Sequence, residues 1–276
     1  MTFTHYIGVD YSSQDRKQKT WVAVGRRTFM GFEVQRLESI GRDGLPDLLK
    51  EYASHRVLAA LDFPFSWPVG FIRHLLGETP RSWMALARAV EEEWSPSKVK
   101  RKRKSFVNQN GTARRLTDTY LDTTSPLQDT YPDLWTMVMT GMPVLAHRPQ
   151  TYRVLPFERL EPSHSSIIEV APEVTLQKLG IPHTQYHGES ETPQERRKEI
   201  LRQLRLSNLV PLDTSSRFYQ DALDSDDALD AVVCGLTGTF FSADASSMGL
   251  ALGMPSPNEM RRVSLEGWIY APEKAV

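Results

Sequence analysis

Hydrophobic and polar positions follow one another along the chain in patterns that predict an α/β protein. Short apolar runs over residues 3–10, 20–25 and 31–40 predict three strands. The links between these runs are short, which favours antiparallel hairpins. The run over 56–62 is apolar almost throughout, as is typical of a central parallel strand that is covered on both faces.

Apolar residues that recur every three or four positions predict helices between and after these strands. We expect these helices over 45–53, 71–76, 83–93, 172–179, 193–206 and 226–241. Two further strands are expected over 165–170 and 266–270. Residues 78–150 hold a basic run and several prolines, and we interpret them as a largely helical region inserted into a single domain that spans 1–276.

Composition limits the possible partners, metal sites and cellular location of the protein. The net charge is −1, so binding of a polyanion would have to depend on a local basic patch. Cys234 is the single cysteine, which excludes an internal disulfide and a cysteine-based zinc site. No apolar run is long enough to span a bilayer, and the N-terminus lacks the basic and apolar segments of a signal peptide. We therefore expect a cytoplasmic protein with no membrane partner.

Acidic residues stand at positions where packing does not explain them. Asp10, Asp62 and Glu169 each come at the end of an apolar strand, and Asp227 and Asp230 lie on the helix over 226–241. Charged groups are costly to bury unless they are paired or bind a metal, and carboxylate oxygens suit Mg²⁺ or Mn²⁺. The sequence therefore predicts a cation site that carries out phosphate chemistry.

Each acidic residue also has a structural alternative. Asp10 could close an Asx turn and Asp62 could cap a turn or helix. Glu169 could form a salt bridge to the arginines of the inserted region, and Asp227 suits the start of a helix because of the helix dipole. A structural role explains Asp230 less well, since it lies past the first turn of the helix and at the edge of the apolar stripe.

The order of these motifs resembles the ribonuclease H-like superfamily, and within it the predicted-nuclease branch called domain-of-unknown-function family 429 (DUF429). The matching segments are Ile7-Gly8-Val9-Asp10, Ala60-Leu61-Asp62-Phe63-Pro64, Glu169-Val170-Ala171-Pro172-Glu173, Asp227-Ala228-Leu229-Asp230-Ala231 and Glu266-Gly267-Trp268-Ile269-Tyr270-Ala271-Pro272. The resemblance implies a ribonuclease H-like core, with a mixed five-stranded sheet flanked by helices, and a divalent-metal nuclease site. The sequence departs from many relatives at Tyr11, which we expect to narrow the site.

A nuclease of this kind would hydrolyse phosphodiester bonds with two Mg²⁺ or Mn²⁺ ions, which hold the attacking water and the departing oxygen. In this hypothesis Asp10 bridges both ions and Asp62 binds one of them. Asp230 and Asp227 bind the other ion, and Glu169 is an additional ligand or orients a metal-bound water. All five carboxylates would then be catalytic as well as metal-binding.

A basic run in the inserted region is the candidate contact for nucleic acid, either DNA or RNA. The basic residues are Lys98, Lys100, Arg101, Lys102, Arg103, Lys104, Arg114 and Arg115. The run could instead be a solvated segment, and Arg115 could pair with Asp118 to order the region. His183 and His187 are four residues apart, but Pro182 and Gly188 favour a loop and no third zinc ligand is apparent.

Two other functions remain open from the sequence. A catalytically inactive nucleic-acid-binding module would have acidic residues that do not converge or that salt bridges neutralise. A phosphotransferase or ATPase of the actin-like or sugar-kinase type would need a duplicated core and glycine-rich phosphate loops, and the chain has neither. Fold alone does not choose between these functions, and the sequence does not determine the oligomeric state.

Overall fold

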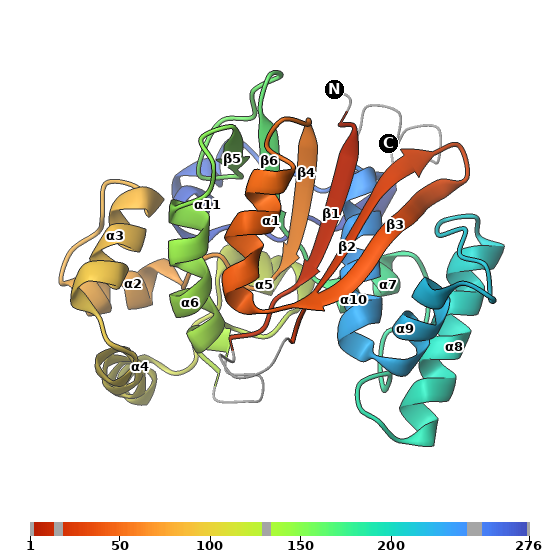
Figure 1. Cartoon of the computed structure of the whole chain (residues 1–276). Coiled ribbons are helices and arrows are strands. Elements are labelled where there is room, and N and C mark those ends of the chain that lie inside the picture. Colours follow the sequence, from red (N-terminus) through yellow and green to blue (C-terminus); the bar gives the residue numbers. More distant parts are fainter. Residues whose placement is uncertain (1–2, 14–18, 129–133, 242–249, 275–276) are drawn as a thin grey trace.

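A six-stranded mixed sheet forms the centre of the computed structural model, which describes residues 3–13, 19–128, 134–241 and 250–274 (Figure 1). Its strands are β1 (His5–Asp10), β2 (Thr20–Thr28), β3 (Gly31–Ile40), β4 (Val57–Asp62), β5 (Tyr152–Val154) and β6 (Ser165–Glu169). The spatial order is β3-β2-β1-β4-β6-β5, where β2 is antiparallel to β1 and β3 and the other neighbours are parallel. The prediction of five strands was wrong, because β5 has only three residues and is too short for a recognisable alternation.

Helices cover both faces of the sheet. On one face, side chains of the sheet share a core cluster with apolar residues of α1 (Leu45–Glu51), α2 (Val69–Leu76), α3 (Trp83–Glu93), α4 (Pro96–Asn110) and α6 (Leu134–Ala146). The other is covered by α7 (Pro172–Lys178), α8 (Glu191–Leu206), α9 (Arg217–Asp224) and α10 (Asp226–Thr239). The remaining elements are η1 (Arg42–Gly44), α5 (Leu116–Leu121), α11 (Met260–Glu266), and a small second sheet of β7 (Leu250–Leu252) and β8 (Pro272–Lys274).

Alternation along the central strands divides the core into two clusters. Ile7 and Val9 of β1 join the cluster under α1 and α6, whereas Tyr6 joins the cluster under α10. In β4, Ala59 and Leu61 lie with the first cluster, and Ala60 with the second. Successive side chains of a strand point to opposite faces, so this alternation also fixes the face to which the residue at the end of each strand belongs.

Helix α10 packs unusually close to strand β1. A Cβ atom at Gly8 would lie 2.0 Å from the carbonyl oxygen of Ala231 and 2.2 Å from the backbone nitrogen of Gly235. Only a residue without a side chain permits this approach. Asp10 is two residues beyond Gly8 on the same face, and Asp230 directly precedes Ala231, so the glycine contact brings the two carboxylates near each other.

The region over 78–150 is largely helical, as expected, and holds most of α3 together with α4, α5 and α6, while 129–133 lie outside the described residues. Its apolar residues share the core under the sheet, since Val138 and Met142 of α6 cluster with Ile7 and Ala59. The expected strand over 266–270 is wrong. Glu266 ends α11, and only Ile269 forms an isolated bridge to Glu169. Within the described ranges, no helix is both long and apolar enough to cross a membrane.

Candidate functional site

Three aspartates lie where β1 and β4 end and α10 begins, near enough for their charges to influence one another. Asp10 and Asp62 are register partners on adjacent parallel strands, so their side chains belong to the same face of the sheet. Asp230 comes to this face from the second turn of α10, whose first turn is capped by the hydroxyl of Ser225, which accepts a hydrogen bond from the backbone nitrogen of Ala228. The lower end of the sheet in Figure 1 holds the site.

The negative charges of these aspartates would repel one another. Burial raises the pKa of Asp10 well above its usual range, and the nearby charges of Asp230 and Asp62 raise it further. Burial and then the charge of Asp230 do the same to the pKa of Asp62. Carboxylates in this arrangement cannot all be ionised without a penalty, which either protons or a bound cation would relieve.

Asp230 is the most deeply placed of the three. Its side chain is buried, and burial raises its pKa to about 7, against the opposite effect of His187 and of a hydrogen bond from Tyr186. The hydroxyl of Tyr186 donates to Asp230 Oδ1 over 2.8 Å. Tyr186 is itself buried, so it holds Asp230 in a fixed orientation.

A histidine lies at the rim of the site. His187 Nε2 is 3.0 Å from Glu173 Oε1, and His187 Nδ1 is 3.4 Å from Asp226 Oδ2. Hydrogen bonds to Asp226 and Glu173 raise the pKa of His187 to about 10, so the imidazole carries a positive charge at neutral pH. The histidine therefore neutralises part of the acidic cluster and ties α7 to the start of α10.

Asp226 and Asp227 play different parts. Although burial raises the pKa of Asp226, hydrogen bonds from His187 and from the backbone nitrogen of Gly188 lower it to a net value of about 2. Burial and the charge of Asp226 raise the pKa of Asp227, while Lys19 opposes this rise. Asp226 is thus bound to the loop that carries His187. Asp227 is therefore the more suitable of the two to bind a cation together with Asp230.

Glu169 belongs to a different network. It pairs in register with Leu61, so alternation places it on the opposite face from Asp62. Arg115 donates from Nη1 to Glu169 Oε2 over 2.9 Å and from Nη2 to Glu169 Oε1 over 2.7 Å, and the backbone nitrogen of Phe65 donates to Oε2. The salt bridge to an arginine of the inserted region, which the sequence left as an alternative, is the arrangement observed.

The basic residues of the inserted region separate into two groups. Arg103 and Arg115 are buried, which contradicts their assignment to a nucleic-acid contact. Arg103 donates to the carbonyl oxygen of Leu127, and Arg115 pairs with Asp118 as well as with Glu169. Arg114 is bound to Asp122. Five other basic residues, Lys98, Lys100, Arg101, Lys102 and Lys104, lie on α4, which is a regular helix.

Tyr11 does not face the aspartates. Its ring lies 4.5 Å from the ring of Phe63, and both residues belong to the core cluster under α1 and α6. The expectation that Tyr11 narrows the site is therefore wrong. Alternation explains the result, since residue 11 is one position beyond Asp10 and falls on the other face.

The aspartates do not form a ready-made metal centre. Across 3–13, 19–128, 134–241 and 250–274, no three His, Cys, Asp or Glu side chains are grouped as they stand so that they could hold a metal ion. Their chemistry nevertheless suits a hard cation, because the donors are carboxylate oxygens. Their raised pKa values mean that a cation would have to displace protons from these carboxyl groups when it binds.

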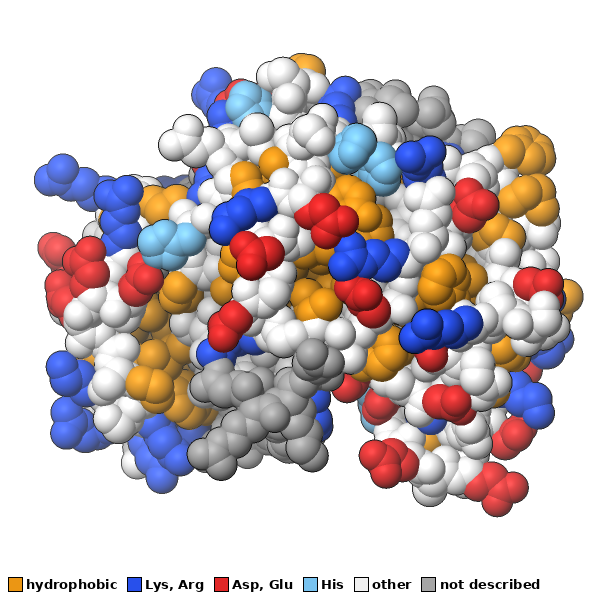
Figure 2. Space-filling view, viewed as in Figure 1, with side chains coloured by type: hydrophobic (Ala, Val, Ile, Leu, Met, Phe, Trp, Pro, Cys, Tyr) orange, Lys and Arg blue, Asp and Glu red, His pale blue; other side chains and the backbone are white. Residues whose placement is uncertain are grey.

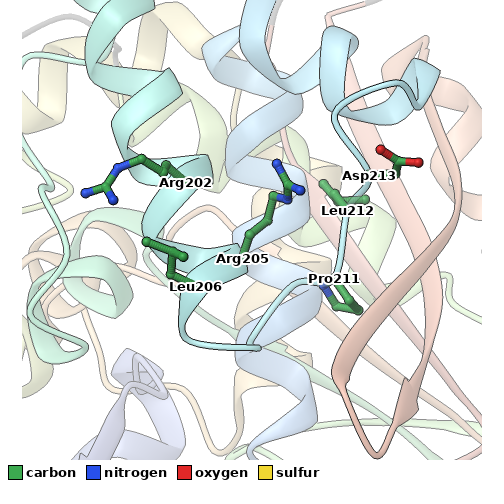
Figure 3. Close-up of a pocket in the computed structure, with 6 residues that line it drawn as sticks. All are labelled: Arg202, Arg205, Leu206, Pro211, Leu212 and Asp213. Carbon is green, nitrogen blue, oxygen red and sulfur yellow. The ribbon is translucent and has the colours of Figure 1, made fainter.

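A pocket of about 460 Å³ lies elsewhere, between the end of α8 and residues 211–213 (Figure 3). Arg202 and Arg205 line it, but their side chains point in different directions. Arg202 pairs with Glu199, and Arg205 lies over the ring of Tyr219. The pocket contains none of the clustered aspartates and offers no pair of converging charges, so the acidic cluster remains the candidate site.

The sequence did not indicate Tyr186, Glu173 or the role of His187. The spacing of His183 and His187 indicates at most a pair of zinc ligands, and no third ligand is apparent. The signal that could have identified the loop is Asp226, because an acidic residue at the start of a helix attracts a neighbouring cation. The partners of His187 depend on tertiary contacts between α7 and α10, which local patterns do not contain.

A family model described as "Protein of unknown function (DUF429)" matches residues 152–256. The match includes Glu173, His187 and Asp230, and lies outside the strands that carry Asp10 and Asp62. No curated protein and no solved structure matches the chain. The family match supports the assignment of the chain to DUF429.

Proposed function

We propose that the protein is a divalent-cation-dependent phosphodiester hydrolase, and that its substrate is nucleic acid. The observation that carries the proposal is the pairing of Asp10 with Asp62 on adjacent strands, with Asp230 brought to the same face by the close approach of α10 to Gly8. The pKa of all three carboxyls is raised by burial and by neighbouring acidic charge. A bound cation would offset the electrostatic cost of ionising these neighbouring carboxyl groups.

Asp10, Asp62 and Asp230 would hold Mg²⁺ or Mn²⁺, with Asp227 beside them. A bound cation of this type stabilises negative charge on a phosphate oxygen and activates a water molecule. Tyr186 keeps Asp230 oriented through its hydroxyl. His187 and Asp226 form an ion pair at the rim, which leaves Asp10, Asp62 and Asp230 as the candidate ligands of the cation.

We also propose that the core is ribonuclease H-like. The resemblance implies a mixed five-stranded sheet, and the run β3-β2-β1-β4-β6 is a mixed sheet of that size, to which β5 is added at the edge. Asp10 and Asp62 occupy the ends of two central strands in this run. Glu169 is not part of the proposed ligand set, since Arg115 holds both of its oxygens.

The test is cleavage of labelled DNA and RNA in Mg²⁺ or Mn²⁺ by the parent protein and by Asp10→Asn and Asp62→Asn. We expect each variant to lose at least about 100-fold in rate, because even outer-shell changes at metal sites cost about 10–100-fold. Asp47→Asn is the matched control, since this exposed aspartate of α1 pairs only with Lys50. Unchanged cleavage by Asp10→Asn would exclude the proposed site, and cation-independent binding without cleavage would favour an inactive nucleic-acid-binding module.

A further inference from the structure

Helix α4 carries an unneutralised basic surface, made of Lys98, Lys100, Arg101 and Lys104. All four side chains are exposed, and α4 contains no acidic residue. Within the described part of the chain, none of the four forms an ion pair, although Lys98 Nζ donates to the carbonyl oxygen of Glu93. In Figure 2, Lys and Arg side chains gather over α4 at the lower left.

The charged face of α8 provides the contrast. Lys198 pairs with Glu195, and Arg202 pairs with Glu199, in both cases within one turn of the helix. Figure 2 shows acidic and basic side chains mixed over α8 at the lower right. These two basic residues of α8 are balanced within their own helix, whereas the four of α4 are not.

The basic surface makes α4 less stable than it would be with mixed charges. Lys100 and Lys104 are four residues apart and repel each other on the same side of the helix. Lys98 lies in the first turn, where the positive end of the helix dipole disfavours a cation. A bound polyanion would relieve both effects.

The buried side of α4 argues against insertion of this helix into a bilayer. Val99 and Phe106 pack into the core under α1 and α6, so α4 has no apolar face left for insertion into a bilayer. The exposed side is about 9 Å long from Lys98 to Lys104, by helical rise, and spans the distance of a few successive phosphates on one strand of a duplex.

We infer that the basic surface of α4 is the docking surface for the phosphate backbone of a nucleic acid, an inference that rests on the proposed function. α4 lies at the lower end of the molecule in Figure 1, which is also the end at which β1 and β4 deliver Asp10 and Asp62. A strand held on α4 is therefore bound at the same end of the sheet as the acidic site. The surface provides backbone contacts and no base readout, so it binds without regard to sequence.

The experiment compares two variants of equal charge change. Lys100→Ala with Lys104→Ala alters α4, and Lys198→Ala with Arg202→Ala alters the balanced face of α8 at the same spacing. Binding of a fluorescein-labelled oligonucleotide, single-stranded and duplex, is measured by anisotropy at several salt concentrations in EDTA. Because EDTA removes free divalent cations, the measurement reports docking whether or not the protein cleaves its substrate.

Affinity decreases with salt, and we expect the slope of log affinity against log salt to be less steep by about 1.4–1.8 in the α4 variant. Each of the two lost contacts contributes about 0.7–0.9 to this change. The α8 variant should keep the slope of the parent. Equal slopes in all three proteins, equal losses in both variants, or no binding by the parent at low salt would each overturn the inference. Binding to anionic phospholipid vesicles without binding to the oligonucleotide would overturn it as well.

Discussion

The buried guanidinium of Arg115 gives the sharpest test of how the inserted region is joined to the sheet. Arg115 donates to Asp118 Oδ1 from Nη2 over 2.8 Å, and to the two oxygens of Glu169 over 2.9 and 2.7 Å. Its Nη1 also reaches the carbonyl oxygen of Glu266 over 3.3 Å. The residue thus connects α5, β6 and the end of α11. Arg115→Met removes the charge and keeps a side chain of similar length.

The expected loss follows from the charges that remain. About 1.5–3 kcal/mol for each of the six hydrogen bonds that the Arg115 side chain donates would give roughly 9–18 kcal/mol. That sum is an upper limit, because Asp118 and Glu169 can take up protons once they are unpaired. Removal of one partner from a buried ion pair costs about 3–5 kcal/mol, and we expect a loss of unfolding free energy in this range.

Urea unfolding followed by tryptophan fluorescence measures the loss of unfolding free energy. In a thermal unfolding experiment, the same loss should lower Tm by about 6–20 °C. Arg114→Met is the matched control, because Arg114 is the preceding residue and pairs with Asp122, whose side chain is 89% exposed. Exposed pairs contribute about 0–1 kcal/mol. Equal losses in Arg115→Met and Arg114→Met would refute the role assigned to the buried network.

Two further predictions concern the packing and the titration of the acidic site. Gly8→Ala should destabilise the protein by more than about 3 kcal/mol, because its Cβ would meet backbone atoms of α10, whereas Gly41→Ala has nothing within 4 Å and should be nearly neutral in the same urea titration. In EDTA, the free energy of unfolding should fall as pH rises from about 4 to about 7. In the unfolded protein the Asp230 carboxyl loses its proton near its ordinary pKa of 3.8, whereas in the folded protein it keeps the proton up to about pH 7. Asp230→Asn should flatten this part of a profile of Tm against pH, and a profile that stays as steep as that of the parent would contradict the assigned pKa.

The central strands and the placement of Asp10 and Asp62 at strand ends could be predicted from the sequence because both depend on local patterns. An apolar run that ends in Asp62 indicates a buried strand and places its carboxylate at the strand end, and the stripe of α10 places Asp230 at the edge of the core. Glu169 follows an apolar run in the same way. Its placement on the opposite face depends on the register between β4 and β6, which the sequence does not show.

Long-range partners account for what the sequence did not predict. The burial of Arg103 depends on its contact with Leu127, which the sequence does not indicate, whereas the pairing of Arg115 with Asp118 and Glu169 was one of two alternatives that the sequence left open. His187 lies in a loop without periodicity, and its two carboxylate partners come from different helices. In each case the decisive contact joins residues that are far apart along the chain or that share no repeating pattern.

The most direct measurement of the central claim is anomalous diffraction from crystals of the protein soaked in Mn²⁺. We expect an anomalous peak within coordination range of carboxylate oxygens of Asp10, Asp62 and Asp230, with the carboxylates turned toward the ion. Soaked crystals of Asp62→Asn should lose the peak or show it strongly reduced. A peak bound only by Glu173 and Asp226 at the rim, or no peak at the end of β1 and β4, would contradict the account.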